Sequence, residues 1–424
     1  MPQDLRAPRG VSDILPADQP YWRWIRDTAT RVAESYGYGE IQTPVFERSN
    51  VWLQEDARGT DLVDKELYIF EDRGGDQLVL RPEGTPAVCR AYLEHGMASW
   101  PQPVRLFYIS NFFRYDRPQA GRYRMFHQFG VEAIGDGDPA IDAEVLDLLR
   151  TFYESLGLTQ YRILLNSIGD QVCRPAYIEK LRAYYADKLD RICGDCRRRY
   201  DVNPLRMLDC KNEPCQPFKA DAPRIVDNLC DACSEHFATV RRLLDGLAIG
   251  YTLDPTLVRG LHYYTRTTFE FEPSDAEGQQ SAIVGGGRYD GLIEQLGGQP
   301  TPGIGFGAGL DRTILNLKRL ELRPEPASPL TAYIAVVDAA AQARTLTLAR
   351  ELRAAGVSVV TGSAGRSLRA QMRHANALGA RYALVLGAKE IANGTVSLRA
   401  LETSAQEDNV TVEHVLARIT SSGL

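Results

Sequence analysis

The glycines at positions 303, 305, 307 and 309 recur with a period of two residues. Successive side chains of a β-strand point to opposite faces, so this spacing predicts a strand with one bare face. A flat ligand, or a closely packed neighbouring helix, can then lie directly against the backbone. Arg312 follows at the start of the next expected helix, where it would face such a ligand.

The first two thirds of the chain carry the pattern of an antiparallel sheet with covering helices. Aromatic and β-branched residues predict strands at 66–71, 77–80, 104–113, 125–134, 256–271 and 281–284. Helical spacing of apolar residues predicts helices at 21–36, 85–95 and 139–156, with Asp18 and Asp138 as caps of the first and last. These elements predict an α+β domain built on an antiparallel sheet.

The pattern changes at a linker rich in Pro and Glu, RPEPASP at 323–329. Beyond the linker, strands and helices alternate, which predicts a small α/β domain with a largely parallel sheet. Within the larger domain, residues 185–245 are rich in Arg and Cys and lack strand alternation, as expected of a helical insertion. We therefore expect a catalytic domain at 1–322, its insertion at 185–245, a linker at 323–330 and an α/β domain at 331–424.

Composition excludes several classes of protein. The chain of 424 residues is 44% hydrophobic and 25% charged, which is typical of folded globular proteins. Its apolar runs fall far short of the roughly 18 residues that span a bilayer, and its charged, proline-containing N-terminus is unlike a secretory signal. We expect a cytoplasmic protein with no membrane partner.

The net charge of −6 argues against a general coat for nucleic acid, but the charge is unevenly distributed. Residues 331–424 carry 10 basic and 7 acidic side chains. Arg366, Arg369 and Arg373 share one face of an expected helix, and such a face suits phosphate contacts. Binding of RNA would therefore rely on local arginine faces.

Nucleotide binding would need an unusual set of residues, because neither GxxxxGK[ST] nor an early GxGxxG occurs. The guanidinium group is planar and suits phosphate and carboxylate oxygens, which is the chemistry of phosphoryl or nucleotidyl transfer. Taken singly, each arginine could equally be a solvated surface charge. The candidate arginines are Arg114, Arg122, Arg124, Arg259 and Arg312.

Six of the eight cysteines fall within 41 residues, which favours a metal over disulfides. Two CxxC pairs are separated by 33 residues, more than the roughly 15–20 of a compact zinc ribbon. We expect four thiolates to bind zinc, with free structural thiols as the alternative, and Cys210 and Cys215 are alternative ligands. The expected ligands are Cys193, Cys196, Cys230 and Cys233.

Six longer stretches of the sequence are typical of one protein family, and the resemblance to that family covers essentially the whole chain. They are Thr43-Pro44 with Phe46-Glu47, RPEGT at 81–85, FYISNFFRYDRPQAGRYRMFHQFGVE at 107–132, LVRGLHYYTRT at 257–267, AIVGGGRYDGL at 282–292 and GIGFGAGLDR at 303–312. With them the chain resembles the class II aminoacyl-tRNA synthetases, and the stretches at 257–267 and 282–292 resemble the histidyl-tRNA synthetases in particular. The resemblance implies a class II catalytic domain, a homodimer formed through the first stretch, and a C-terminal anticodon-binding domain.

The resemblance also implies roles for individual residues. Arg114 and Arg259, the expected catalytic residues, would reach the ATP α-phosphate from opposite sides, and Arg312 would stack on adenine. The implied ATP-binding set is Arg114, Arg122, Arg259 and Arg312. Glu83, Thr85 and Gln128 would hold the α-amino group of histidine. Its imidazole would meet Glu132 and Tyr264, in a pocket lined by Tyr263 and Tyr289.

Three positions depart from the family pattern. His262 stands where Asp usually precedes the tyrosine pair, so it either lies outside the pocket or slightly lowers the affinity for a cationic substrate. Asp116 and Asp311 stand where Glu is common, which keeps the charge and shortens the reach. His127, although close to the expected site, is interpreted as structural.

The expected activity is ligation of L-histidine to tRNA(His) with ATP and Mg²⁺. One alternative is a non-catalytic regulatory subunit of ATP phosphoribosyltransferase, a synthetase-like protein that lacks the anticodon-binding domain. The other is a zinc-dependent nucleic-acid-binding module, which would have no reason to keep the glycine and arginine sets.

Overall fold

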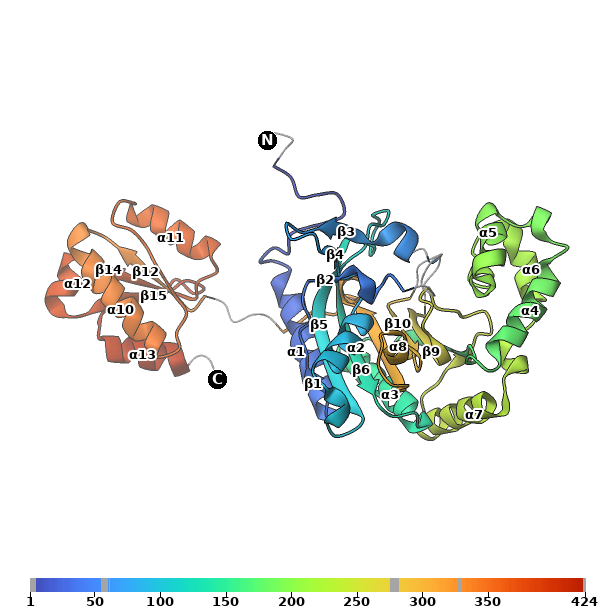
Figure 1. Cartoon of the computed structure of the whole chain (residues 1–424). Helices are drawn as coiled ribbons and strands as arrows, with labels where there is room; N and C mark the ends of the chain where they lie inside the picture. Colours follow the sequence, from blue (N-terminus) through green and yellow to red (C-terminus); the bar gives the residue numbers. More distant parts are fainter. Residues whose placement is uncertain (1–4, 55–59, 61, 275–281, 326–329, 422–424) are drawn as a thin grey trace. The chain divides into compact units, whose positions relative to one another are not determined.

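The computed structural model describes residues 5–54, 60, 62–274, 282–325 and 330–421. The chain divides into two compact units, Met1–Pro324 and Glu325–Leu424 (Figure 1). Half of the expected linker, residues 326–329, and Ser281 of an expected strand lie outside the described residues. Among the described residues, no helix combines the length and apolar character needed to cross a membrane.

The larger unit contains a sheet of eight described strands in the order β1-β5-β6-β11-β10-β9-β7-β8. The inner pairs from β5 to β7 are antiparallel, and the two edge pairs, β1 with β5 and β7 with β8, are parallel. The expected α+β fold on an antiparallel sheet is therefore confirmed. The strands are β1 (Gly39–Glu40), β5 (Val104–Phe113), β6 (Met125–Ile134), β7 (Tyr161–Ser167), β8 (Thr252–Leu253), β9 (Thr265–Pro273), β10 (Val284–Arg288) and β11 (Gly303–Gly309).

A small antiparallel sheet adjoins the large one in this unit. It pairs β2 (Phe46–Arg48), β4 (Gln77–Leu80) and β3 (Tyr68–Glu71). The short helices nearby are α2 (Thr85–Glu94) and α8 (Leu292–Gln295). Val45, Phe46, Ile69 and Phe70 leave apolar side chains exposed on and beside these strands.

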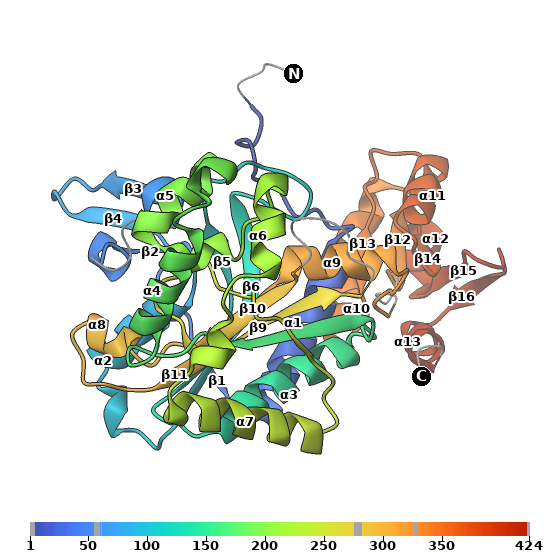
Figure 2. The ribbon, with the colours of Figure 1, turned by 90° about the vertical axis from the view of Figure 1, so that its right-hand side faces the viewer.

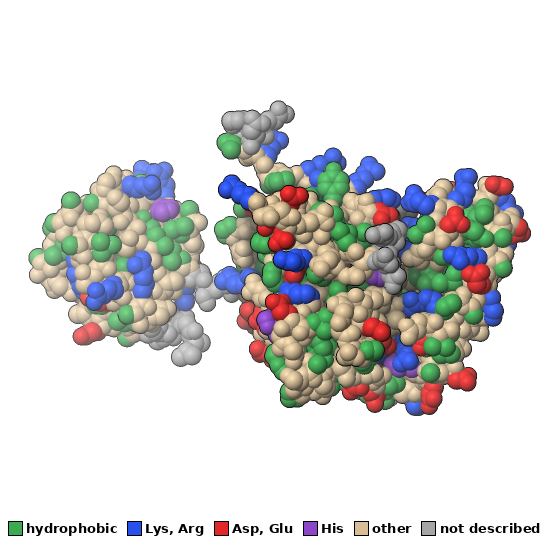
Figure 3. Space-filling model, in the orientation of Figure 1, with side chains coloured by type: hydrophobic (Ala, Val, Ile, Leu, Met, Phe, Trp, Pro, Cys, Tyr) green, Lys and Arg blue, Asp and Glu red, His purple; other side chains and the backbone are tan. Residues whose placement is uncertain are grey.

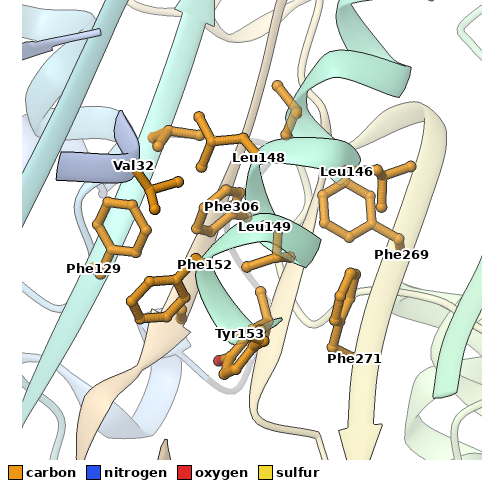
Figure 4. Packing of buried hydrophobic residues seen from close by; sticks show 14 of the residues in the cluster. Val32, Phe129, Leu146, Leu148, Leu149, Phe152, Tyr153, Phe269, Phe271 and Phe306 are labelled. Carbon is orange, nitrogen blue, oxygen red and sulfur yellow. The ribbon is translucent and has the colours of Figure 1, made fainter. Parts of the chain in front are cut away.

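Alternation along the strands gives the large sheet two different faces. Phe129 of β6 and Phe306 of β11 point into the hydrophobic core, packing against α3 (Pro139–Ser155), as Figure 4 shows. Val131 of β6 belongs to the same core. The helices α1 (Gln19–Ser35), α7 (Asp231–Gly246) and α9 (Leu310–Arg319) contribute to the same core (Figure 2). The intervening polar residues and glycines of these strands therefore face the other side.

The starts of α1 and α3 differ from each other. Asp138 caps α3 as expected, because its carboxylate accepts a hydrogen bond from the amide of Ala140 at 2.8 Å. Asp18 precedes α1 without a capping bond from its side chain. Its carboxylate lies instead 2.6 Å from the ammonium group of Lys318 on α9.

Residues between β7 and β8 form helices and turns only, as expected of a helical insertion. Its longer helices are α4 (Arg174–Tyr185), α5 (Gly194–Val202), α6 (Gln216–Ala220) and α7. The strand expected at 256–271 starts only at Thr265. The apolar residues before it, Val258 and Tyr263 among them, are buried in a second core cluster instead of pairing as a strand.

The C-terminal unit has a five-stranded sheet in the order β13-β12-β14-β15-β16. The bounds are β12 (Ala332–Val336), β13 (Val359–Thr361), β14 (Tyr382–Leu386), β15 (Val396–Ala400), β16 (Gln406–Val410), α10 (Gln342–Ala354), α11 (Leu368–Ala377), α12 (Ala388–Asn393) and α13 (Val412–Ser421). Only the pairs of β12 with β13 and β14 are parallel, so the prediction of a largely parallel sheet was wrong for β15 and β16. The six-residue α12 is too short for a parallel crossover, which needs about a dozen residues or more.

Candidate active site

Two adjoining cavities, of about 340 Å³ and about 270 Å³, open over the face of the large sheet that the helical core leaves free. Their linings share Arg114, Arg122, Gln128, Arg259, Gly285 and Gly307, so the two form one continuous space. The larger cavity also includes Arg312, and the smaller includes Glu83, Thr85, Tyr263 and Tyr264. The structure thus brings together residues from β6, β10, β11 and the segments before α2 and β9.

Glu132 lies behind the smaller cavity and is fully buried. Its carboxylate accepts hydrogen bonds from Thr85 at 2.7 Å and from the hydroxyl of Tyr289 at 2.6 Å. Burial raises the pKa of this carboxyl to about 8, although the bonds from Tyr289 and Thr85 favour the ionised form. Glu132 is therefore a buried acid held in one orientation by its neighbours.

Glu83 is the second buried acid of the smaller cavity. It accepts a hydrogen bond from the hydroxyl of Tyr263 at 2.8 Å, and Arg114 lies 4.0 Å away. Burial raises the pKa of Glu83, and the nearby positive charge of Arg114 opposes that rise. Burial likewise raises the pKa of Tyr264 to about 12, so its hydroxyl stays protonated at neutral pH.

The glycines of β10 and β11 make room for these side chains. A Cβ on Gly305 would lie 2.1 Å from a carboxylate oxygen of Glu132, and one on Gly303 would lie 2.3 Å from the ring of Tyr289. A Cβ on Gly285 would lie 1.9 Å from the guanidinium of Arg259. The bare strand face expected from the sequence is thus real, and pocket side chains occupy part of it.

The candidate arginines differ in their partners. Arg259 forms an ion pair with Glu270 of β9, and Arg122 pairs with Asp116. Arg312 donates to the carbonyl of Gly121 at 2.7 Å. Arg124 is not part of these cavities: its guanidinium stacks on Tyr115 at 4.0 Å and lines a separate hollow.

Several lining residues were missed by sequence reasoning. Glu270 and Glu272 alternate on β9 and could have been found from that spacing. Tyr108 is buried beside Glu132, at 3.4 Å from its carboxylate. Asp209 and Lys211 of the insertion reach the larger cavity, and no local pattern in the sequence indicates this.

Comparison with known proteins decides the family. Residues 10–313 match the family model described as histidyl-tRNA synthetase, and residues 331–422 match the one described as an anticodon binding domain. A histidine–tRNA ligase from Dehalococcoides mccartyi is 50% identical over 401 residues, which cover 95% of this chain and 96% of that relative. The chain belongs to the histidyl-tRNA synthetase family.

Other relatives agree with this assignment. A histidine–tRNA ligase from Pelotomaculum thermopropionicum is 47% identical over 94% of both chains. The crystal structure of the apo histidyl-tRNA synthetase from Staphylococcus aureus superposes with a TM-score of 0.81 at 34% identity, covering 98% of this chain and 99% of that one. As a member of the histidyl-tRNA synthetase family, the chain is an aminoacyl-tRNA synthetase, an ATP-dependent ligase with the class II fold.

The anticodon-binding unit of this synthetase carries the expected arginine face. Arg366, Arg369 and Arg373 are exposed on and just before α11. On the inner side of the helix, Gln371 is buried and bonds both backbone groups of Val336 on β12. Figure 3 shows basic side chains gathered beside α11 at the top of this unit.

His262 and His127 of the synthetase core each pack against an aromatic side chain. The ring of His262 packs edge-on against Tyr263 and lines, with Trp52 and Pro86, a small cavity that shares Glu83 and Tyr263 with the smaller main cavity. It does not line either of the two main cavities. His127 borders the larger cavity, and its ring packs against Trp22 with centroids 4.5 Å apart.

The cysteines of the insertion divide differently from the expected set. The two CxxC pairs do not meet: Cys193 and Cys196 lie with Cys210 and Cys215, and Cys230 and Cys233 lie with Asp170 and Cys173. The prediction of one metal site formed by Cys193, Cys196, Cys230 and Cys233 is therefore wrong. The chain folds each pair against nearer partners, because α5 and α7 begin at different places in the insertion.

Proposed function

We propose that the chain activates L-histidine with ATP, releasing pyrophosphate, and then transfers the histidyl group from the adenylate to the 3′ end of tRNA(His). The observation that carries this proposal is the continuity of the two cavities. The smaller cavity, which the buried Glu83 lines and the buried Glu132 backs, opens directly into a space lined by four arginines. An amino acid and a nucleoside triphosphate can thus meet at Arg114 and Arg259.

The acids and hydroxyls suit histidine, which has a cationic amino group and two ring nitrogens. Glu83, with Thr85 and Gln128, would bind the α-amino group. Glu132 and the hydroxyl of Tyr264 would pair with the imidazole nitrogens, and Tyr263 and Tyr289 would wall the pocket. An amino acid without these nitrogens would leave buried polar groups unpaired, which discriminates by roughly 10⁴-fold.

Activation requires attack of the histidine carboxylate on the α-phosphorus, with pyrophosphate leaving. Arg114 and Arg259 would stabilise the negative charge that grows on the α-phosphate oxygens, and this is mainly a matter of position and charge. Arg312 would lie against adenine, and Arg122 would hold the distal phosphates. Burial and the neighbouring Arg122 lower the pKa of Arg312, which is consistent with a place for an anion between them.

The donor set of the larger cavity also fits Mg²⁺, which prefers oxygen ligands and often binds with nucleotide phosphates. Glu270 and Glu272 would hold the ion, and both line this cavity. When bound, Mg²⁺ would neutralise phosphate charge. Glu270 pairs with Arg259 in this structure, and it would then be shared between the arginine and the ion.

Two further partners follow from surfaces. The exposed apolar residues Val45, Phe46, Ile69 and Phe70 support a homodimer formed through the small sheet. The exposed face of Arg366, Arg369 and Arg373 supports tRNA contacts in the C-terminal unit. Such an enzyme would work in the cytoplasm, where tRNA is charged.

The decisive test is exchange of labelled pyrophosphate into ATP that depends on L-histidine. We expect exchange with the full chain, and its loss in Arg259→His and Arg114→Ala. Arg124→Ala is the matched control, because Arg124 lies outside the two cavities. Absence of histidine-dependent exchange in the folded chain would instead favour a regulatory role.

A further inference from the structure

Four cysteines of the insertion surround one point. The sulfur atoms of Cys193, Cys196, Cys210 and Cys215 all lie within 4.8 Å of one another. Those of Cys193 and Cys210 are 3.8 Å apart, close to the roughly 3.8 Å expected between two sulfurs on a tetrahedral zinc with bonds of about 2.3 Å. We propose that these four thiolates bind one structural zinc ion.

The backbone around the cluster supports bound thiolates. The amide of Cys196 donates to the sulfur of Cys193 at 3.4 Å, and the amide of Cys193 donates to the sulfur of Cys215 at 3.3 Å. Amide hydrogens directed at sulfur stabilise a negative charge there. Cys196, Cys210 and Cys215 are also buried, so the ion would be protected from solvent.

The surrounding structure needs such a link. The cluster joins the start of α5 to Cys210, which follows the short turn Pro204–Met207, and to Cys215 in the short turn Glu213–Cys215. These pieces have three to nine residues each (Figure 1, green). In small folds of this kind, zinc binding supplies folding free energy directly.

The ion would also position residues at the larger cavity. Asp209 and Lys211 line that cavity, and they flank Cys210 directly in the sequence. Fixing Cys210 therefore fixes the segment that brings Lys211 to the cavity that Arg259 and Glu270 also line. If the cavity binds ATP, as proposed above, Lys211 is a positioning residue for its phosphates.

A separate cluster supports a second ion. Asp170 and Cys173 follow β7, and Cys230 and Cys233 stand at the start of α7, with all four ligand atoms within 4.8 Å. Oδ1 of Asp170 lies 3.6 Å from the sulfur of Cys173, near the roughly 3.6 Å expected for oxygen and sulfur on one zinc. We infer a second zinc site here, which would join the entry of the insertion to its exit.

Metal analysis of the full chain, purified without added zinc, tests both sites without relying on activity. We expect two equivalents of zinc per chain. Cys196→Ser and Cys210→Ser should each lose one equivalent, Cys233→Ser should lose the other, and Cys89→Ala, outside both clusters, should keep both. One equivalent that is lost with Cys196→Ser and with Cys210→Ser but kept with Cys233→Ser would overturn the second site and support the first.

Measurements on the unmodified chain avoid the risk that a variant fails to fold. Removing zinc with a chelator should expose four thiols for the first site and three for the second to a thiol reagent. Cobalt in place of zinc should give the absorption of a tetrahedral thiolate site. Less than half an equivalent of metal, or disulfides seen by mass spectrometry of the native chain, would overturn the proposal.

The positioning role has its own test. Lys211→Ala should keep both zinc ions and raise KM for ATP about tenfold in pyrophosphate exchange, with little change in KM for histidine. Lys180→Ala, an exposed lysine of the same insertion that pairs with Asn228, is the control. An unchanged KM for ATP would refute the role of Lys211. It would not contradict the two proposed metal sites.

Discussion

The hydroxyl of Tyr289 donates a 2.6 Å hydrogen bond to Glu132 across β11, above the bare positions Gly303 and Gly305. The two residues come from segments 157 positions apart in the sequence. Because β11 has no side chains there, the acid and the phenol can meet directly. The glycine face thus serves the pocket before any ligand binds.

Tyr289→Phe removes this bond and leaves the ring in place. A hydrogen bond to a charged or titrating carboxyl contributes about 1.5–3 kcal/mol, so we expect KM for histidine to rise about tenfold or more. KM for ATP should change little. Tyr153→Phe is the control, since that buried hydroxyl contacts Thr313 on the opposite face of the sheet.

Gly305→Ala tests the bare face itself. The added Cβ would lie 2.1 Å from Glu132 and 2.3 Å from the carbonyl oxygen of Val131, and the backbone atom cannot yield easily. We expect kcat/KM for histidine in pyrophosphate exchange to fall about 10²-fold, since such displacements misplace reacting groups. Gly291→Ala, where an added Cβ meets nothing within 4 Å, should leave the exchange rate unchanged.

The raised pKa of Glu132 makes stability depend on pH. Its pKa rises from 4.5 to about 8 on folding because the carboxyl is buried. Between these values the folded chain holds a proton that the unfolded chain has released. The contribution of Glu132 to the free energy of unfolding is therefore complete below about pH 4.5 and is lost as the pH rises through about 8. In urea unfolding, the free energy of unfolding of the wild type should therefore fall relative to that of Glu132→Gln as the pH rises over this range.

Above pH 8 the difference between the two proteins should become constant, because Glu132 is then ionised in both states. The Gln variant keeps the shape of the side chain and cannot titrate. A difference that is flat from pH 5 to 8 would show that Glu132 has an ordinary pKa.

We predict a change in the free energy of unfolding when the buried ion pair between Arg288 and Asp142 is broken. Arg288 and Asp142 are both fully buried and paired, and His236 of α7 lies 2.9 Å from the same carboxylate. Asp142→Ala would remove the buried partner of Arg288 and leave it paired only with the more exposed Asp290 at 3.1 Å, which we expect to cost about 1–3 kcal/mol. Glu154→Ala on the same helix removes a partly exposed pair with Arg150 and should cost less than about 1 kcal/mol in denaturant unfolding.

Sequence patterns predicted the local elements well and the long-range pairings poorly. The strands 104–113 and 125–134 agree with the structure at both ends, because their side chains alternate between a core and a pocket face. The grouping of Cys196 with Cys210, and the approach of Lys211 to Arg259, depend on how the insertion folds back. No residue near these positions signals that path, so spacing alone selected the wrong cysteine set.

Variants of the exposed arginines of α11 should affect the transfer of histidine to tRNA without affecting its activation with ATP. The double variant Arg369→Ala and Arg373→Ala removes two positive charges from a face that points away from the core of its unit. If the face contacts tRNA phosphates, kcat/KM for tRNA should fall about tenfold or more, and its dependence on salt should weaken. Histidine-dependent pyrophosphate exchange should be unchanged, because the cavities lie in the other unit. Arg350→Ala, exposed on α10, controls for the loss of surface charge alone, and an equal effect of this variant on aminoacylation would refute a specific role for α11.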